Sequence, residues 1–414
     1  MAAHRAPGGA AEPVLTLAEA QAILLDGVAP GPVEICPLSE CAGRTLAEDV
    51  VAGRSQPPDP VSAMDGYAVR NEDAVAGAEL QLIGESPAGA PFQGQVTQGK
   101  AVRIATGGVV PAGGDRIVIQ ERVEREGDRI RIVETPDLAT FVRAAGSDFG
   151  AGETVLSAGA RLTPGRLALA AAANWNLLPV HGAPRVVILA SGDELREPGD
   201  RLGYGDIVNS ASYAIEDLVW IWGGEPRRLP ILPDDRDSCR KRLKAASLDA
   251  EIIVPLGGAS VGDRDSLRPL FAEMGAEILF DRVAVQPGKP TWHARFPDGR
   301  LVVGLPGNPA SGFVCAWLFL KPLLDRLLGR GTAPNFIPAV AAADLPAVGP
   351  REMFLRGRVE VGPDARLSAS AERFQDSHLQ LPLARANALI RRPPNAPALA
   401  AGGMVEVMII GDLA

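Results

Sequence analysis

Cysteine and histidine are scarce in this chain of 414 residues, which has four of each. The cysteines are Cys36, Cys41, Cys239 and Cys315, and no two of them have C-x-x-C spacing. The histidines are scattered along the chain. This pattern argues against a structural zinc site and against a disulfide framework. Reduced cysteines are typical of the cytoplasm, so we expect a cytoplasmic protein.

Positive charge is also in deficit, because 41 Lys and Arg residues stand against 50 Asp and Glu residues, a formal net charge of −9. This balance disfavours a nucleic-acid partner, so any phosphate must be bound locally. Long apolar runs are missing as well. The run Phe313–Leu320 ends at Lys321, far short of the roughly 20 residues of a membrane span. We therefore expect no nucleic-acid or membrane partner.

The length of the chain predicts several domains, since one core rarely serves so many residues. The start of the chain is rich in Ala, Gly and Pro and lacks the apolar core of a signal peptide. We expect a multidomain fold of the α/β plus β class: a disordered tail at 1–14, a small helical or mixed linker domain from 15–50 and 151–180, a β-rich domain inserted at 51–150, a doubly wound α/β domain at 181–330 and a C-terminal β domain at 331–414.

In the N-terminal half, helical spacing predicts helices over Leu17–Asp26 and over Ser39–Glu48, the second with Ser39 as its N-cap. A third helix is predicted over Arg166–Ala173, after the N-cap and N1 pair Thr163-Pro164. Short apolar runs between turn residues predict strands in the inserted domain. They are Leu80–Ile83, Val102–Ala105, Arg116–Gln120 and Arg129–Val133, with a hairpin turn at Glu126-Gly127-Asp128.

From Pro184 to about Arg330, continuous apolar runs alternate with amphipathic segments, a pattern typical of a parallel sheet with crossover helices. In such a domain, ligands bind beyond the carboxyl ends of the strands. The predicted strands are Arg185–Ala190, Arg228–Leu232 and Glu251–Leu256, and the predicted helices are Ala211–Trp222, Asp235–Ala246 and Leu267–Met274. Beyond Pro334 the best predicted strands are Met353–Val361 and Met404–Ile410.

A first glycine loop, Val254–Asp263, follows one of these strands and contains Gly257, Gly258 and Ser260. Glycines let backbone amides approach an anion closely, and a following helix N-terminus favours negative charge. The loop is neither a Walker A motif nor a dinucleotide fingerprint. Phosphate or pterin binding and a plain tight turn both explain it.

A second loop, Gly304–Ser311, leads into an apolar helix that is expected to run to about Leu328. Asn308 suits the N-cap and Pro309 the N1 position, so capping alone explains this pair. Capping does not explain the preceding Gly-Leu-Pro-Gly, which includes Pro306 and Gly307. This segment favours a backbone shaped around a ligand.

Acidic residues follow three of the predicted strands. They are Asp193-Glu194, Asp234-Asp235, and Asp263 with Asp265. Carboxylates converging on one crevice suit Mg²⁺, although each could instead be a solvated turn or a helix cap. Lys289, within Gln286–Pro290, is a candidate phosphate contact, or alternatively an ordinary exposed lysine.

Together these loops resemble the molybdopterin molybdenumtransferases, the family that includes the C-terminal part of gephyrin. The resemblance extends from about residue 15 to the C-terminus. Its motifs are, in order, Ser-Ala-Met-Asp-Gly-Tyr-Ala at 62–68, Ala-Thr-Gly at 105–107, Ser-Gly-Asp-Glu-Leu at 191–195, Gly-Gly-Ala-Ser-Val-Gly-Asp at 257–263, Pro-Gly-Lys-Pro at 287–290 and Gly-Leu-Pro-Gly-Asn-Pro at 304–309.

The resemblance implies a homodimer of four-domain subunits, in which the β-rich domain of one subunit completes the site on the α/β domain of the other. It implies that molybdate is inserted into adenylylated molybdopterin with Mg²⁺-dependent release of AMP. The implied catalytic residues are Asp65 and Thr106 at the oxyanion end, and Glu194, Asp234 and Asp265 for positioning metal and water. The implied ligand-binding residues are Gly257, Gly258, Ser260, Lys289, Pro306, Gly307, Asn308, Pro309, Arg356 and Ser377, with Asn387 in the same C-terminal motif.

The chain departs from the family pattern at several positions. Gln286 stands where some members have lysine, with Arg282 nearby, and Ser266 stands where an aromatic is common. Trp292-His293 is also atypical. These departures keep open a non-catalytic or altered paralogue that carries molybdopterin. The preceding adenylyltransferase step is a second alternative, disfavoured by the long β-rich half, and its enzyme is a candidate partner. The sequence does not distinguish molybdate from tungstate.

Overall fold

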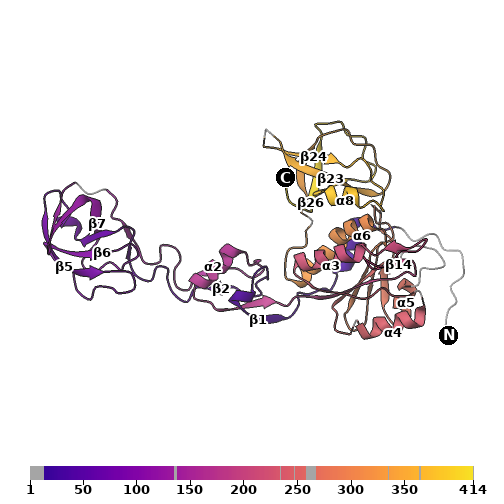
Figure 1. Cartoon of the computed structure of the whole chain (residues 1–414), viewed down its shortest axis with the longest axis horizontal. Helices are drawn as coiled ribbons and strands as arrows, with labels where there is room; N and C mark the ends of the chain where they lie inside the picture. Colours follow the sequence, from indigo (N-terminus) through magenta and orange to yellow (C-terminus); the bar gives the residue numbers. More distant parts are fainter. Residues whose placement is uncertain are drawn as a thin grey trace. The chain divides into compact units, whose positions relative to one another are not determined.

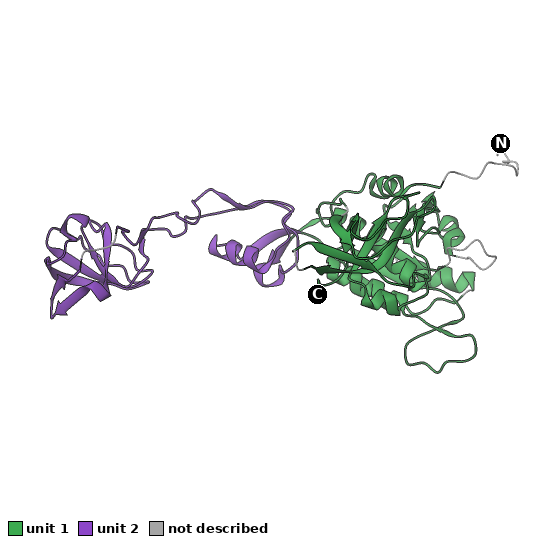
Figure 2. Cartoon of the chain, turned by 90° about the horizontal axis from the view of Figure 1, so that it is seen from above, with its two compact units in different colours: residues 1–34, 181–414 green, residues 35–180 purple. Residues whose placement is uncertain are grey.

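The computed structural model describes residues 14–134, 138–233, 235–246, 248–257, 267–333, 335–362 and 365–413. The chain divides into two compact units, one of residues 1–34 and 181–414 and the other of residues 35–180 (Figure 2). Among the described residues, none of the helices has the length and apolar character needed to cross a membrane. We call the two parts unit 1 and unit 2.

Part of unit 2 is a small mixed domain built from both ends of its sequence (Figure 1). Helix α2 (Pro164–Ala172) begins at the predicted Pro164, and β2 (Val50–Val51) pairs antiparallel with β11 (Thr154–Leu156). Strand β1 (Val33–Pro37) pairs with β12 (Leu177–His181). Side chains from residues 36–50 and 156–180 share one core, as expected if the β-rich segment is inserted between them.

The predicted helix over Ser39–Glu48 was wrong. Only a 3₁₀ turn, Leu38–Glu40, forms there. The following residues pair with distant segments instead, since Leu46 donates its backbone amide to Ala160 and forms a bridge with Val180. Gly43, with φ of 76°, also interrupts helical geometry. Tertiary pairing has overridden the local helical spacing.

The β-rich part of unit 2 is a six-stranded sheet in the order β7-β4-β6-β5-β9-β8. The four predicted strands and the hairpin turn are confirmed, with Gly127 at φ of 60° in the turn. The two faces of the sheet have separate cores. The strands are β4 (Gly66–Val69), β5 (Glu79–Ser86), β6 (Lys100–Ile104), β7 (Arg116–Ile119), β8 (Val123–Glu126) and β9 (Arg129–Ile132); β3 (Val61–Ser62) pairs with β10 (Val142–Arg143), and short 3₁₀ turns lie at Asn71–Asp73 and Gln120–Arg122.

Unit 1 contains a six-stranded α/β sheet in the order β16-β13-β17-β21-β20-β18. The first four strands are parallel, β20 is antiparallel to β21, and β18 is antiparallel to β20 and so runs in the same direction as the first four. Alternate residues of β13 enter two different cores, one on each face, which explains why its sequence is apolar from Val186 to Ala190. The strands are β13 (Arg185–Ala190), β16 (Glu225–Arg228), β17 (Ile252–Leu256), β18 (Glu277–Phe280), β20 (Trp292–Arg295) and β21 (Leu301–Gly304).

The helices of this sheet match the predictions closely. They are α3 (Ala211–Trp222), α4 (Arg236–Ala246), α5 (Leu267–Glu273) and α6 (Pro309–Cys315), which continues through a π-helical segment (Ala316–Leu320) into α7 (Lys321–Leu327). Helix α1 (Leu17–Leu25) is confirmed too and starts with a capping box between Thr16 and Glu19. Its buried residues Leu17, Ala20 and Leu24 belong to a core of unit 1.

The predicted strand Arg228–Leu232 was wrong in position and in burial. The strand is β16, Glu225–Arg228, at the edge of the sheet, and none of its side chains is fully buried. Arg228 pairs there with Glu197 and Glu216. An edge strand needs no continuous apolar run, so the apolar residues 229–232 gave a misleading signal.

The C-terminal strands form a barrel in the order β19-β23-β24-β22-β26-β25, which the β23–β25 pairing closes. Both predicted strands are confirmed, as β23 and β26. The elements are β19 (Val285–Gln286), β22 (Ile337–Ala341), β23 (Glu352–Val361), β24 (Leu367–Ala371), β25 (Ala388–Arg392) and β26 (Met404–Ile409), with the short helix α8 (Leu381–Arg385). Strand β19 precedes Lys289 in the chain, so the barrel is connected directly to the candidate site.

Candidate functional site

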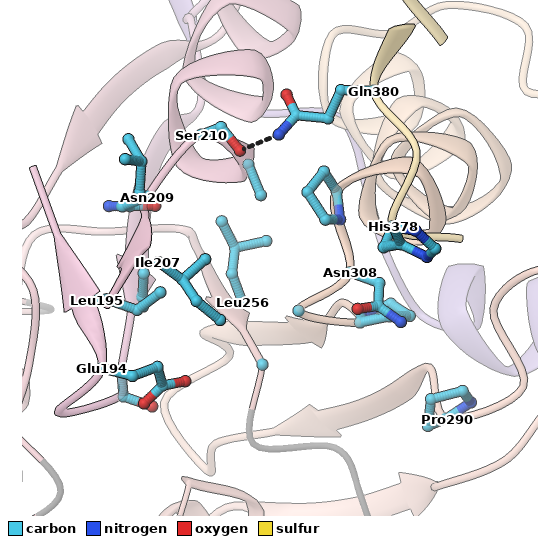
Figure 3. A pocket seen from close by; sticks show the side chains of 18 of the residues that line it. Glu194, Leu195, Ile207, Asn209, Ser210, Leu256, Pro290, Asn308, His378 and Gln380 are labelled. Carbon is cyan, nitrogen blue, oxygen red and sulfur yellow. Dashed lines mark hydrogen bonds between the residues drawn. The ribbon is translucent and has the colours of Figure 1, made fainter. Parts of the chain in front are cut away.

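A cavity of about 810 Å³ lies at the carboxyl ends of β13, β17 and β21 (Figure 3). This is the edge at which ligands bind in doubly wound domains. Segments distant in sequence line it, from residues 190–195, 207–211, 256–257, 281–290, 306–309 and 378–380. Of the predicted residues, the cavity brings together Glu194, Gly257, Lys289, Pro306, Gly307, Asn308 and Pro309.

Two glycine loops meet at the floor of this cavity. The backbone amide of Gly257 donates a hydrogen bond to Leu305 O at 3.1 Å, and Leu256 forms a parallel bridge with Leu305. A Cβ atom added at Gly307 would lie 3.0 Å from the Cα of Gly257, which itself has φ of 85°. Both loops therefore depend on glycine at the point of contact. Gly258 and Ser260 lie outside the described residues.

Asn308 occupies the predicted N-cap of α6, with Pro309 at N1, but its side chain makes no capping hydrogen bond. That part of the prediction was wrong. The amide Nδ2 instead donates to Ser377 Oγ at 2.9 Å, and Ala310 N donates to Ser377 O at 3.1 Å. The side chain has been recruited to bind the C-terminal segment that forms one wall of the cavity.

His378 and Gln380 extend this wall, and Gln380 Nε2 donates to Ser210 Oγ at 2.9 Å (Figure 3). Asn209 and Ser210 lie on the opposite strand-to-helix connection. Sequence reasoning missed these four residues. Only the motif Asp-Ser-His at 376–378 could have pointed to His378, because the others have no distinctive spacing.

Arg356 of β23 is buried, only 1% exposed, and does not line the cavity. Its guanidinium donates to the carbonyl oxygens of Leu379 at 3.0 Å and of Asp376 at 3.1 Å. Burial lowers the pKa of this guanidinium from its usual value, opposed by the nearby Asp376 and Glu372. Arg356 thus holds the loop that carries Ser377 and His378.

Only one of the three predicted acidic groups can be located fully. Glu194 lines the cavity, and its carbonyl accepts a hydrogen bond from Ile207 N at 2.8 Å, where β14 (Leu195–Arg196) pairs with β15 (Ile207–Val208). Asp234, Asp263 and Asp265 lie outside the described residues. Within the described ranges, no three His, Cys, Asp or Glu side chains are grouped so that they could hold a metal ion.

Hydrogen bonds to neighbouring residues hold the loop that presents Lys289 in place. Val283 N donates to Lys289 O at 3.0 Å, and Thr291 Oγ1 donates to Gly288 O at 2.8 Å. Gly288 has φ of 118°, and a Cβ there would lie 2.2 Å from Cys315 Sγ. Burial raises the pKa of the Cys315 thiol to about 12, so this thiol stays neutral. The lysine ammonium is exposed at the cavity.

Two further cations at this cavity, Arg268 and Arg282, were not predicted as site residues. Arg268 Nη1 donates to Asp281 Oδ2 at 2.5 Å, and Arg282 Nε lies 3.9 Å from Asp281 Oδ1. Arg268 comes from α5, which carries no recognisable motif. Only the fold places Arg268 at the same cavity as Arg282 and Lys289.

Asp65 and Thr106 lie together in unit 2, at the ends of the paired strands β4 and β6. Thr106 N donates to Asp65 Oδ1 at 2.6 Å. This backbone hydrogen bond lowers the pKa of the Asp65 carboxyl, so the group stays ionised at neutral pH. The structure thus brings these two predicted residues together, in a different unit from the cavity.

Comparison with known proteins agrees with this architecture along most of the chain. Family models match residues 15–174 (MoeA N-terminal region, domain I and II), 187–326 (probable molybdopterin binding domain) and 338–410 (MoeA C-terminal region, domain IV). The crystal structure of a molybdopterin biosynthesis MoeA protein from Pyrococcus horikoshii has a TM-score of 0.81 at 28% identity, covering 97% of this chain and 100% of that one.

Two curated relatives carry the name molybdopterin molybdenumtransferase. The one from Nostoc is 35% identical over 91% of this chain and 88% of the relative. The one from Haemophilus influenzae is 32% identical over 95% and 98% respectively. Fold and site together define a multidomain transferase of molybdenum cofactor biosynthesis. More specifically, the chain belongs to the molybdopterin molybdenumtransferase family.

Proposed function

We propose that this enzyme inserts molybdate into adenylylated molybdopterin and releases AMP. One observation carries the proposal: two glycine loops, a lysine and an amide from separate segments surround a single cavity at the strand ends. The volume of about 810 Å³ falls within the range of small-molecule and cofactor sites. The substrate named here contains a pterin, a nucleotide and the diphosphate that joins them.

The chemistry of the lining suits such a substrate. At Gly257 and Gly307 no side chain screens the backbone, so phosphate oxygens can approach it closely; the Gly257 amide itself is bonded to Leu305 O. Asn308, Ser210 and Gln380 offer donors and acceptors for polar edges, while Lys289 supplies positive charge. The reaction needs no covalent nucleophile, because binding, orientation and charge neutralisation stabilise its transition state.

We propose that Mg²⁺ accompanies the diphosphate, where it would neutralise charge and act as a Lewis acid. Glu194 would contribute one ligand, since carboxylate oxygens suit this hard cation. Asp234 and Asp265 are the further proposed ligands on the grounds of the family resemblance. Chelation with EDTA should then abolish AMP release, and added Mg²⁺ should restore it. Release that persists in EDTA would remove the ion from the proposal.

The direct test is a turnover assay with adenylylated molybdopterin, molybdate and Mg²⁺. Wild type should release AMP, and Glu194→Ala and Asp234→Ala should release much less while retaining the wild-type circular dichroism spectrum. Consumption of ATP in place of the adenylylated pterin would identify an adenylyltransferase instead. Binding of the activated pterin without AMP release would identify a carrier.

We further propose a cytoplasmic homodimer in which Asp65 and Thr106 of one subunit complete the cavity of the other. This proposal is supported by the family resemblance and by the hydrogen bond between Thr106 and Asp65. Asp65→Ala and Glu194→Ala would each be inactive alone. Mixed after dissociation, the two variants should recover about a quarter of wild-type activity, because half of the dimers are mixed and each contains one intact site. No recovery would contradict a shared site.

A further inference from the structure

The connection between β15 and α3 carries two adjacent polar side chains that line the cavity, Asn209 and Ser210 (Figure 3). Strand β15 pairs with β14, and the residue after β15 continues this pairing, since Asn209 N donates to Arg196 O at 2.8 Å. Asn209 therefore lies beside Glu197, the residue that follows β14. Asn209 is only 4% exposed, so its amide is largely shielded from bulk solvent.

Glu197 is held in place by groups on its other side. Its carboxylate accepts hydrogen bonds from Arg228 Nη1, at 3.1 Å to each oxygen, and from Tyr213 OH at 2.9 Å. The Arg228 guanidinium also lies over the Tyr213 ring, 3.9 Å from the ring centroid. The hydrogen bond to Glu197 raises the pKa of the Tyr213 phenol, so the phenol remains a donor. The carboxylate thus has a fixed position beside Asn209.

This carboxylate determines how the Asn209 amide is oriented. An ionised carboxylate can only accept hydrogen bonds, so it attracts the amide NH2 group and repels the amide oxygen. Accordingly, Asn209 Nδ2 donates to Glu197 Oε1, at 3.5 Å. Asn209 Oδ1 accepts no hydrogen bond from any residue that the structure describes. The oxygen is left as an acceptor for a ligand in the cavity.

Ser210 offers the complementary group. Its Oγ accepts a hydrogen bond from Gln380 Nε2 at 2.9 Å, and a hydroxyl that accepts one bond can still donate its own hydrogen. Over the described ranges of the chain, this hydroxyl has no acceptor. An acceptor on Asn209 and a donor on Ser210 are therefore adjacent at the cavity. Such a pair matches the edge of a heterocycle that carries an amino group next to a ring nitrogen.

We propose that Asn209 determines specificity for the amino group of a heterocycle, and that Glu197 is a positioning residue that keeps the Asn209 oxygen directed toward it. The inference rests on the proposed function, whose substrate contains two such heterocycles, the pterin and the adenine. A carbonyl in place of the amino group would set oxygen against oxygen and leave the buried amide oxygen unpaired. Sites built around a hydrogen bond discriminate strongly against analogues that cannot form it.

The test is equilibrium binding of two pairs of compounds to the full-length chain. Pterin is compared with lumazine, and AMP with inosine monophosphate, because the second member of each pair has a carbonyl where the first has the amino group. Wild type should prefer the amino member of a pair by about tenfold, the expected effect of one hydrogen bond. Preference for pterin over lumazine assigns the pterin to Asn209, and preference for AMP over inosine monophosphate assigns the adenine.

Two variants test the two roles. Asn209→Leu, which has a similar shape but no amide, should abolish the preference. Glu197→Gln should reduce it, because a glutamine amide can donate to Asn209 Oδ1 and so allows the Asn209 amide to turn. The matched control is Glu216→Gln, since Glu216 pairs with the same Arg228 at 3.2 Å but makes no hydrogen bond to Asn209. This control should keep the wild-type preference.

Three results would overturn the proposal. One is equal affinity of wild type for both members of each pair, and another is an absence of binding to all four compounds. The third is a preference that persists in Asn209→Leu. An equal loss of preference in Glu197→Gln and Glu216→Gln would remove the positioning role of Glu197, because any disturbance of the Arg228 contacts would then have the same effect.

Turnover separates this inference from the proposed function. Asn209→Leu should raise the KM for adenylylated molybdopterin by about tenfold and leave kcat nearly unchanged, since its role is to bind the heterocycle and not the reacting atoms. A wild-type KM in this variant contradicts the specificity role while the reaction stands. If wild type discriminates within a pair of compounds but releases no AMP, the reaction fails and the specificity role stands.

Discussion

Asn308 Nδ2 donates a hydrogen bond to Ser377 Oγ at 2.9 Å, and so connects the turn before α6 to the segment before α8. The two residues are far apart in sequence but adjacent at the cavity. The wall containing His378 and Gln380 is thereby fixed to the floor formed by Gly307. The position of a ligand against the floor consequently depends on residues of the C-terminal barrel.

Substitution of either partner should loosen this wall. Asn308→Ala and Ser377→Ala should each destabilise unit 1 by about 1 kcal/mol, the usual net value of one hydrogen bond. The double variant should cost less than the sum, because the two single changes remove the same interaction. Urea denaturation of the four proteins measures this coupling. Strict additivity would show that the bond contributes nothing.

Gly307→Ala should impair ligand binding more than stability. The new Cβ would lie 3.0 Å from Gly257 Cα, so one of the two glycine loops must shift. We expect at least a tenfold increase in the Kd of the activated pterin, about 1.4 kcal/mol. The matched control is Gly349→Ala, at a glycine of unit 1 with open space around it. Equal affinity in both variants would contradict the role of the glycine contact.

Arg356→Lys should weaken ligand binding even though Arg356 does not line the cavity. Lysine keeps the charge but cannot reach the carbonyls of Leu379 and Asp376 together with the Gln375 side chain. The 374–380 loop should lose order, and backbone amides there should exchange hydrogen faster in mass spectrometry. Affinity for the pterin substrate should fall in parallel. Unchanged exchange with reduced affinity would instead indicate direct contact between Arg356 and the ligand.

His293 should make unit 1 sensitive to mild acid. Burial lowers the pKa of its imidazole to about 4, while Nδ1 contacts Val302 O at 2.8 Å. Between the folded pKa and the unfolded value of about 6.5, the unfolded chain binds the extra proton, so stability falls as pH decreases through this window. The loss should approach about 3 kcal/mol by pH 4.

The measurement is urea denaturation of wild type and His293→Leu, followed by tryptophan fluorescence at several pH values between 7 and 4. The variant should lose stability at every pH because of altered packing. Its decline toward acid should be shallower than that of wild type. Parallel pH profiles would assign the acid sensitivity to other groups.

The elements that sequence reasoning located well are those in which local pattern and tertiary environment agree. Arg185–Ala190 is apolar on both faces because both faces are covered, and Ala211–Trp222 ends at Gly223, which adopts φ of 95°. Agreement fails where the environment is special. Strand β16 lies at the edge of its sheet. In the segment from Ser39 to Glu48, several backbone amides donate hydrogen bonds to residues far away in the sequence.

The residues of the candidate site also fall into two groups, those that the sequence indicated and those that it did not. Glycine turns and Asn-Pro are visible in sequence because unusual backbone geometry restricts residue type locally. Arg268, Gln380 and Ser210 belong to no recognisable motif. Their place at the cavity follows from the fold and could not be predicted from local sequence. The wrong capping prediction for Asn308 has a similar origin, because a local partner and a remote one compete for one side chain.

The buried Arg356 holds the cavity wall from a strand of the barrel, although it does not itself line the cavity. We therefore expect changes in the buried residues around Arg356 to reshape this wall even where every residue that lines the cavity stays the same. Differences in ligand preference between members of the family are then to be sought in the buried contacts between Arg356 and the 374–380 segment as much as around the cavity itself.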